Sequence, residues 1–126
     1  MNARPTLKST DDEIIDFVTS WIDEVIASGY ADASKLLDPP WEKERNPFSE
    51  SDWKEELECY ESGSRVTNPR KVKDLRREVY RYDDGSGYAV DYDLAINDER
   101  SDHTLQFDFR EIDERLNISL DHLHVL

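Results

Sequence analysis

The chain of 126 residues carries 30 acidic and 16 basic side chains, a formal charge of −14, and its charged and hydrophobic fractions are both 37%. This negative field repels nucleic acid and anionic lipid and attracts basic proteins, so we expect neither a nucleic-acid ligand nor a membrane surface as partner. The length fits one domain, and four Phe, six Tyr and three Trp supply the bulk of an aromatic-rich core.

Cysteine usage and the start of the chain bear on the compartment. Cys59 is the single cysteine, so an internal disulfide cannot form, and residues 1–9 lack the apolar core of a secretory signal. No run approaches the roughly 20 apolar residues that a membrane span needs. We therefore expect a cytoplasmic protein with a flexible leader at 1–9 and a single domain at 10–126.

Two helices are predicted in the N-terminal half. Thr10 and Glu13 have the spacing of a capping box, and apolar residues then recur at three and four spacing until Gly29 supplies an exit. Ser49 or Ser51 caps the second helix. Its apolar positions are Trp53, Leu57 and Tyr60, and Gly63 can close it.

The segments around these helices are shorter. Residues 31–37 can add a helical turn, and residues 39–47 are rich in Pro, Trp and charge, which indicates an ordered loop pinned by Trp41. Asn68 followed by Pro69 can start a further short turn.

Alternation of apolar and polar residues dominates the last third of the chain. It predicts strands near 76–82, 88–96, 104–112 and 115–124, separated by a glycine turn at 83–87 and by a polar break at 97–102. The fold class is therefore α+β, with two N-terminal helices packed on a four-stranded antiparallel meander sheet. At the end of the chain the parity changes, and a bulge would let Leu123 and Val125 reach the core.

The polar face of this sheet is the candidate binding site. If Ile96 lies opposite Leu105, then Asp93 lies beside Asp108 and Asp91 beside Arg110. Like charges in opposite positions cost stability, so the pair would suit a surface that receives Arg or Lys from another protein; the alternative is a solvated face. The predicted partner-binding residues are Asp91, Asp93, Glu99, Asp108 and Asp121. Charge reversal at Asp93 and Asp108 is expected to leave the melting temperature unchanged or raised.

A basic island interrupts the acidic chain. It consists of Arg65, Arg70, Lys71, Lys73, Arg76, Arg77 and Arg81. Pairing with the acidic helices is the interpretation we favour, because the overall field opposes a phosphate or RNA contact and no glycine-rich phosphate loop accompanies the cluster.

The sequence also contains residues of types that support catalysis or metal binding in other proteins. His103 falls in the predicted loop, while His122 and His124 share a strand face and could chelate a metal, but no Cys pair or helical His-Glu motif accompanies them. No carboxylate spacing singles out an acid and a base, and Cys59 has no base beside it, which favours a structural thiol. Trp41, Trp53 and Tyr60 could line a small-molecule pocket, although aromatics at helical spacing are typical of a core. We expect no enzymatic activity, no metal and no cofactor.

Several stretches carry a resemblance to a known group. They are Trp21–Tyr30, Leu36–Trp41, Leu105–Phe109 and Leu120–Leu126. They resemble small acidic bacterial domains of unassigned function, and their acidity and expected shape are similar to those of immunity proteins, the cytoplasmic antidotes that bacteria pair with toxins. The resemblance implies an inhibitor of a basic toxin domain, such as a nuclease, that covers or distorts the active site of the toxin.

Two alternatives remain open from the sequence. A cone-shaped domain that binds or transforms a small ligand would need a cavity of roughly 300 Å³ or more between helix and sheet. A mimic of nucleic acid would need carboxylates spaced regularly over one surface. The oligomeric state is not predicted by any of these patterns.

Overall fold

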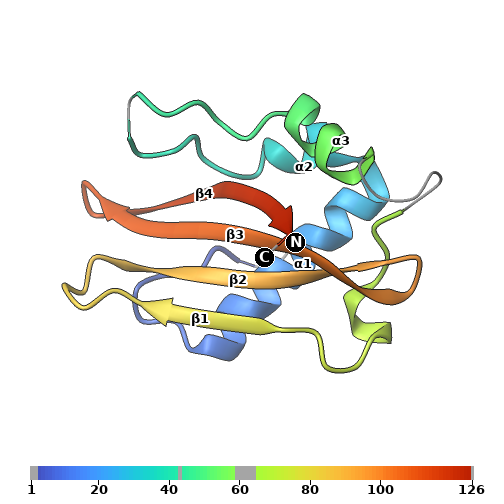
Figure 1. Ribbon diagram of the computed structural model, residues 1–126. Helices are drawn as coiled ribbons and strands as arrows, with labels where there is room; N and C mark the ends of the chain where they lie inside the picture. Colours follow the sequence, from blue (N-terminus) through green and yellow to red (C-terminus); the bar gives the residue numbers. More distant parts are fainter. Residues whose placement is uncertain (1–2, 43, 59–64, 126) are drawn as a thin grey trace.

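The chain folds into an antiparallel sheet with a long helix behind it (Figure 1). This computed structural model describes residues 3–42, 44–58 and 65–125, without the side chains of Glu58, His124 and Val125. The strands are β1 (Arg77–Arg81), β2 (Gly87–Ile96), β3 (Glu99–Ile112) and β4 (Arg115–Val125), and their spatial order is β1-β2-β3-β4. The predicted α+β class and four-stranded meander are confirmed.

Helix α1 (Asp11–Ser28) forms where the sequence indicates it. The Thr10 hydroxyl accepts a hydrogen bond from the Glu13 amide at 3.2 Å, and the Thr10 amide donates to the Glu13 carboxylate at 2.8 Å, which completes the capping box. Gly29 ends the helix at φ 88°. Its buried face consists of Ile14, Phe17, Val18, Thr19, Trp21, Ile22 and Val25.

The interface between α1 and the sheet is filled with aromatic side chains. The rings of Trp21 and Phe107 meet edge to face at 5.4 Å, and those of Phe17 and Phe109 at 6.2 Å. The hydroxyls of Thr19 and Tyr92 lie 2.7 Å apart and satisfy each other inside this core. Packed side chains therefore occupy the place where the cone-shaped alternative requires its cavity.

The second predicted helix does not pack on the middle of the sheet as α1 does. Helix α3 (Glu50–Glu58) lies beside the short α2 (Tyr30–Ser34) and the end of β4, not across the middle of the sheet (Figure 1). The Ser49 hydroxyl accepts from the Asp52 amide at 3.0 Å, so the Ser49 cap is confirmed. The Tyr30 and Trp53 rings stack at 4.6 Å and join the two helices. Tyr60 and Gly63, predicted in this helix, lie outside the described residues.

The expected register between β2 and β3 is wrong by four residues. Asp93 is opposite Thr104 instead of Asp108, and Asp91 is opposite Gln106 instead of Arg110. The predicted loop at 97–102 is shorter than expected, because Asn97 and Asp98 both have positive φ, 54° and 62°, and form a tight hairpin turn. Strand β3 therefore begins at Glu99, and the register of the whole pair shifts accordingly.

Strand β4 contains the predicted irregularity. Gln106 is opposite His122 while Phe107 is opposite Leu120, so Asp121 is the extra residue of a bulge, and Leu123 is buried. Along the free edge of β4, the Asp38 amide donates to the Ile118 carbonyl at 2.7 Å, and the Ile118 amide donates to the Asp38 carboxylate at 3.0 Å.

The leader and the 69–71 turn also make specific contacts. Arg4 binds the Asp38 carboxylate at 2.6 Å, and the Tyr88 hydroxyl donates to the Thr6 carbonyl at 3.1 Å, which holds this part of the leader against the sheet. The turn η1 (Pro69–Lys71) begins after Asn68, whose side chain accepts from the Arg70 amide at 3.0 Å; the predicted turn is confirmed.

Candidate functional site

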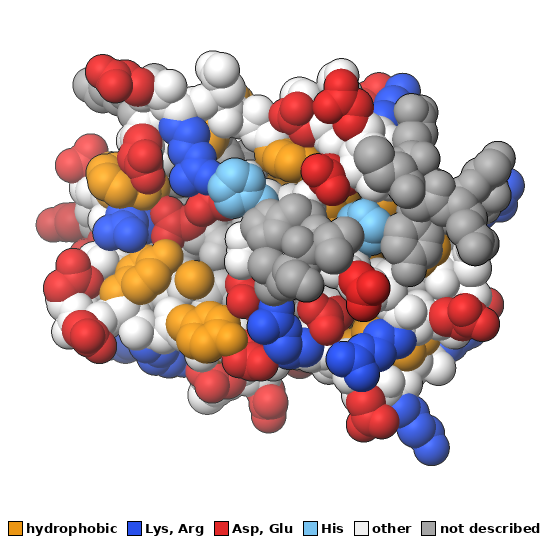
Figure 2. Space-filling view, viewed as in Figure 1, with side chains coloured by type: hydrophobic (Ala, Val, Ile, Leu, Met, Phe, Trp, Pro, Cys, Tyr) orange, Lys and Arg blue, Asp and Glu red, His pale blue; other side chains and the backbone are white. Residues whose placement is uncertain are grey.

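The candidate site is the outer face of the sheet, the side turned away from α1 and toward the viewer in Figure 2. It differs from the inner face in that most of the side chains that cover it are polar or charged. Glu78, Tyr80, Tyr82, Asp91, Asp93, Thr104, Gln106, Asp108, Arg110 and Ser119 project from it. Two of its aspartates, Asp93 and Asp108, are each only 6% exposed.

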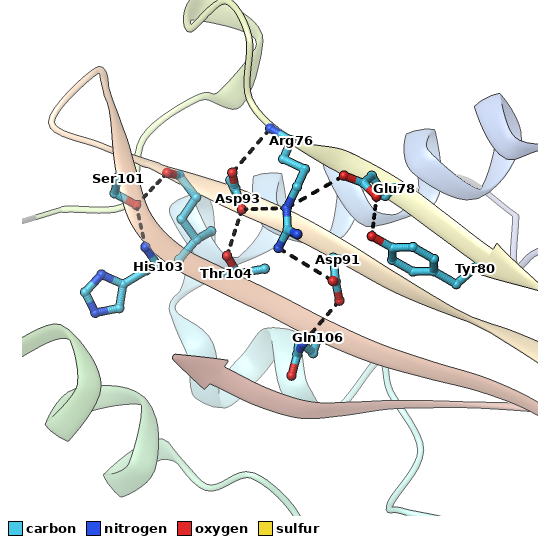
Figure 3. A network of polar contacts seen from close by, with 10 residues as sticks. Arg76, Glu78, Tyr80, Asp91, Asp93, Ser101, His103, Thr104 and Gln106 are labelled. Atoms are coloured by element: carbon cyan, nitrogen blue, oxygen red, sulfur yellow. Dashed lines mark hydrogen bonds and ion pairs between the residues drawn. The ribbon is translucent and has the colours of Figure 1, made fainter. Parts of the chain in front are cut away.

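Asp93 lies at the centre of a hydrogen-bonded network (Figure 3). It accepts the Thr104 hydroxyl at 2.7 Å and the Arg76 amide at 3.3 Å, and the Arg76 guanidinium lies 3.6 Å away. The same guanidinium lies 3.5 Å from the Asp91 carboxylate, which also accepts the Gln106 side-chain amide at 3.3 Å. One arginine is therefore shared by both aspartates, and both are engaged within the fold.

Asp108 is held by a second set of donors. The Tyr82 hydroxyl donates a hydrogen bond to its carboxylate, and the Arg110 guanidinium lies 3.7 Å away. Burial, together with this hydrogen bond to Asp108, raises the pKa of Tyr82. The phenol is therefore a fixed donor to Asp108.

Arg110 also joins two aromatic rings on this face. Its guanidinium lies 4.8 Å from the centre of the Trp41 ring and 4.7 Å from that of Tyr82, a cation–π arrangement with both. Trp41 nevertheless stays 41% exposed and Tyr80 44% exposed. Loop 39–47 is thus attached by its tryptophan to the outer face, not to the core. We call Trp41, Tyr80 and Tyr82 the aromatic patch.

Acidic residues are concentrated at one end of the sheet. The β1–β2 and β3–β4 turns lie at the same end (Figure 1), where the Glu111 amide donates to the Ser86 carbonyl at 2.8 Å. Exposed acids gather on and beside these turns, and we call them the acidic end: Asp83, Asp84, Glu111, Asp113 and Glu114. Figure 2 shows hydrophobic side chains exposed among acidic ones on this side of the molecule. Hydrogen bonds from Ser86 lower the pKa of the Asp84 carboxyl, which favours its charged form.

The environment of Asp121 disfavours the charged form of its carboxyl group. Burial, with an added contribution from the charge of Asp108, raises its pKa, although Arg45 at 3.6 Å and the Ser119 hydroxyl at 3.2 Å oppose the shift. Arg45 also donates to the His122 ring nitrogen Nε2 at 2.9 Å, since a guanidinium has no acceptor.

The five residues predicted to bind a partner are not gathered into one exposed acidic surface. Asp91, Asp93 and Asp108 are on the outer face but are occupied by Arg76, Tyr82 and Arg110, and the expected Asp93–Asp108 pairing is wrong because Asp108 is opposite Ala89 and Ser119. Glu99 is exposed on the β2–β3 hairpin, at the other end of the sheet, and Asp121 lies in the β4 bulge.

The aromatic patch was not predicted as a unit from the sequence. Tyr80 on β1 and Tyr82 directly after it have the same parity as Glu78, so their position on the polar face could have been read from that spacing. The contact between Arg110 and Trp41 spans residues far apart in the chain, and no local pattern signals it.

The basic island is divided by the fold. Arg70 binds Asp23 at 2.8 Å and Arg81 binds Asp11 at 2.8 Å, so the predicted neutralisation of the first helix is confirmed for these two residues. The remaining exposed cations make no ion pair with any residue in the described ranges: Arg65, Lys71, Lys73 and Arg77. Arg77 donates a hydrogen bond to the Pro69 carbonyl at 2.9 Å.

The two histidines with described side chains lie on different strands, His103 on β3 and His122 on β4. His103 is 2% exposed, and its Nε2 lies 3.1 Å from the Glu56 carbonyl. Its predicted position in a loop is wrong, because β3 begins at Glu99, four residues before His103. Within the described residues there is no group of three or more His, Cys, Asp or Glu placed to hold a metal ion. Cys59 and the His124 side chain lie outside that description. None of the described helices has the length and apolar character needed to cross a bilayer.

Fold and outer face together define a small α+β domain with a polar, aromatic sheet face. The chain belongs to the family of the domain of unknown function DUF7668, whose model matches residues 22–126. That match includes the C-terminal part of α1 from Ile22 onward, both shorter helices and the entire sheet. No match was found among curated proteins or among solved structures.

Proposed function

We propose that this domain is a non-enzymatic protein-binding module with a basic protein as its partner, and that it acts as an immunity protein. In this proposal it neutralises a bacterial toxin domain, such as a nuclease, by covering or distorting the active site of the toxin. The finer statement is supported by the resemblance of the sequence to small acidic bacterial domains of unassigned function, whose acidity and shape are similar to those of immunity proteins.

One observation carries the proposal: the aromatic patch is exposed directly beside the acidic end. Trp, Tyr and Arg are the residues most enriched at energetic hot spots of protein interfaces, and Trp41, Tyr82 and Arg110 are in contact here. Exposed acids around such a patch attract a basic partner and orient it before the rings are buried.

The buried aspartates have a supporting part in this proposal. Asp108 fixes Tyr82 and Arg110, and Arg110 in turn holds Trp41 on the face. Asp91 and Asp93 are bound by Arg76, so binding a partner directly would require that this network be broken. The same occupation argues against a catalytic role for these carboxylates, because a general base needs an accessible lone pair. The proposed contacts are therefore the aromatic patch and the acidic end.

The test uses the tagged chain and the proteins encoded beside it. Each neighbouring product is co-expressed and the complex is recovered at low salt; the proposal expects a basic domain in stoichiometric amount and expects co-expression to restore growth that this domain alone inhibits. Affinity is then measured for Trp41→Ala with Tyr80→Ala, and for Asp83→Asn with Asp113→Asn. The variant with Trp41→Ala and Tyr80→Ala should lose at least tenfold in affinity for the partner, since hot-spot truncations cost about 2 kcal/mol or more.

Matched controls are available on the same chain. Leu36→Ala removes an exposed hydrophobic side chain outside the face, and Glu99→Gln with Asp102→Asn removes two charges at the opposite end of the sheet. These variants should bind as the parent does. Equal loss in the Glu99 and Asp102 variant would place the contact at the hairpin instead, and a chain that purifies alone with a bound metabolite would defeat the proposal.

A further inference from the structure

A hollow of about 610 Å³ lies away from the outer face, beside the C-terminal end of α1. One wall is apolar and includes Val25, Ile26, Trp53 and Leu57, while residues 65–68 and Lys71 form the other. The volume is in the range of small-molecule sites, which run from about 300 to 1,000 Å³.

The polar wall of this hollow is held in a fixed position. Val66 forms a β-bridge with Ile96, the Thr67 amide donates to the Ala95 carbonyl at 3.0 Å, and the Asn97 amide donates to the Arg65 carbonyl at 2.9 Å. The segment is thus attached to the end of β2 like a short extra strand. Its side chains have a defined place relative to the apolar wall, as a recognition site requires.

The charges at the hollow are unusual for this acidic chain. Arg65 and Lys71 both line it, and neither makes an ion pair with a residue in the described ranges, whereas Arg70, Arg76 and Arg81 of the same island do. Among the described residues of the lining, Asp98 is the acidic one. Two cations next to an apolar wall match a ligand that has a flat apolar body and one anionic group.

We infer that the hollow between α1, α3 and the 65–71 segment binds a small amphipathic organic anion, with its apolar body against Ile26, Trp53 and Leu57 and its carboxylate or sulfonate beside Arg65 and Lys71. This site is separate from the outer face and does not depend on the proposed partner. The Asp98 carboxylate repels an anion in the hollow, so the site favours a ligand with one negative charge over a ligand with several.

The test compares two fluorescent probes on the full chain. 8-Anilinonaphthalene-1-sulfonate carries a flat apolar body and one negative charge, and N-phenyl-1-naphthylamine has the same body without the charge. The folded wild-type chain should bind the sulfonate with one site and more tightly than the neutral probe. Arg65→Gln and Lys71→Gln should each weaken sulfonate binding by about fivefold, typical of an exposed charge pair, and leave the neutral probe unchanged. Asp98→Asn should strengthen sulfonate binding.

Two further variants locate the site and exclude a general charge effect. Lys73→Gln makes the same charge change in the same island outside the hollow and should bind both probes as wild type does. Ile26→Trp fills the hollow and should weaken both probes by more than about tenfold, while Leu36→Trp, at an exposed position elsewhere, should not. Each variant is checked for an unchanged circular dichroism spectrum. Equal sulfonate affinity in Lys71→Gln and wild type, or in Ile26→Trp and wild type, would overturn the inference.

Discussion

The Thr104 hydroxyl donates a hydrogen bond to the Asp93 carboxylate at 2.7 Å across neighbouring strands, at the position where the sequence had suggested a second aspartate. The expected repulsion between Asp93 and Asp108 is thus replaced by a hydrogen bond between Asp93 and Thr104. Because Asp93 is 6% exposed and Arg76 completes its shell, the carboxylate is part of the architecture of the sheet.

Removal of this donor should destabilise the fold. Thr104→Val keeps the shape but leaves the buried carboxylate one hydrogen bond short, which costs about 2 kcal/mol. Asp93→Lys should lower the melting temperature further, because it places a lysine beside Arg76 and leaves the Thr104 hydroxyl without its acceptor. The structure therefore replaces the expectation that charge reversal at Asp93 leaves the melting temperature unchanged or raised. Chemical denaturation measures both, with the exposed Asp102→Asn on the same strand as a control that stays within about 0.5 kcal/mol.

Asp121 predicts a specific pH dependence of stability. Because burial and Asp108 raise its folded pKa above the ordinary 3.8, the folded state holds the proton more tightly than the unfolded chain. Its contribution is present at low pH and is lost as pH rises toward the raised value. Asp121→Asn should therefore melt higher than wild type at pH 7, and the difference should vanish below pH 3.8. A difference that grows on acidification would contradict the assignment.

Gly87 predicts a steric effect at the start of β2. A Cβ at this position would collide with the Phe109 carbonyl oxygen, and the backbone φ is +157°. Gly87→Ala should cost about 3 kcal/mol, as overpacking does in a filled interior. Gly85 has positive φ but open space around it, so Gly85→Ala should cost only about 1 kcal/mol. Thermal unfolding of the two variants separates the collision from backbone strain, and equal costs would remove the steric explanation.

Arg110 predicts an effect on partner binding with little effect on folding. Lys in its place keeps the charge but loses the planar contact with Trp41 and Tyr82, so the tryptophan is less well oriented. Arg110→Lys should weaken partner affinity by about fivefold. Arg115→Lys, an exposed arginine paired with Asp38 at 3.3 Å, is the matched control. If both variants bind equally well, Trp41 does not depend on Arg110.

Local patterns were sufficient for the elements themselves. The capping box of Thr10 and Glu13 marks the start of α1 correctly, and alternation marks all four strands, because both signals act over a few residues. The β4 bulge was also predictable, since the parity of Leu120 and Leu123 cannot be reconciled without an extra residue.

Pairing across strands could not be predicted from those patterns. The register depends on the turn, and the polar stretch after Ile96 looks like a loop although Ser101 and His103 continue the inward parity of Leu105. A single misassigned hairpin moved every partner of Asp91 and Asp93. The candidate site was correspondingly placed on the right face but with the wrong neighbours, and the contribution of Trp41 required knowledge of where a loop distant in sequence folds back.

The contact between Asp38 and Ile118 has a consequence for how molecules of this protein meet. Both outward backbone groups of Ile118 are occupied, so a foreign strand cannot extend the sheet there. The opposite edge strand is β1, which is only 5 residues long and contains Arg77, Glu78 and Arg81. Addition of a strand from another molecule is thus disfavoured at both edges of the sheet. We therefore expect concentrated solutions of the protein to form no fibrils by strand addition.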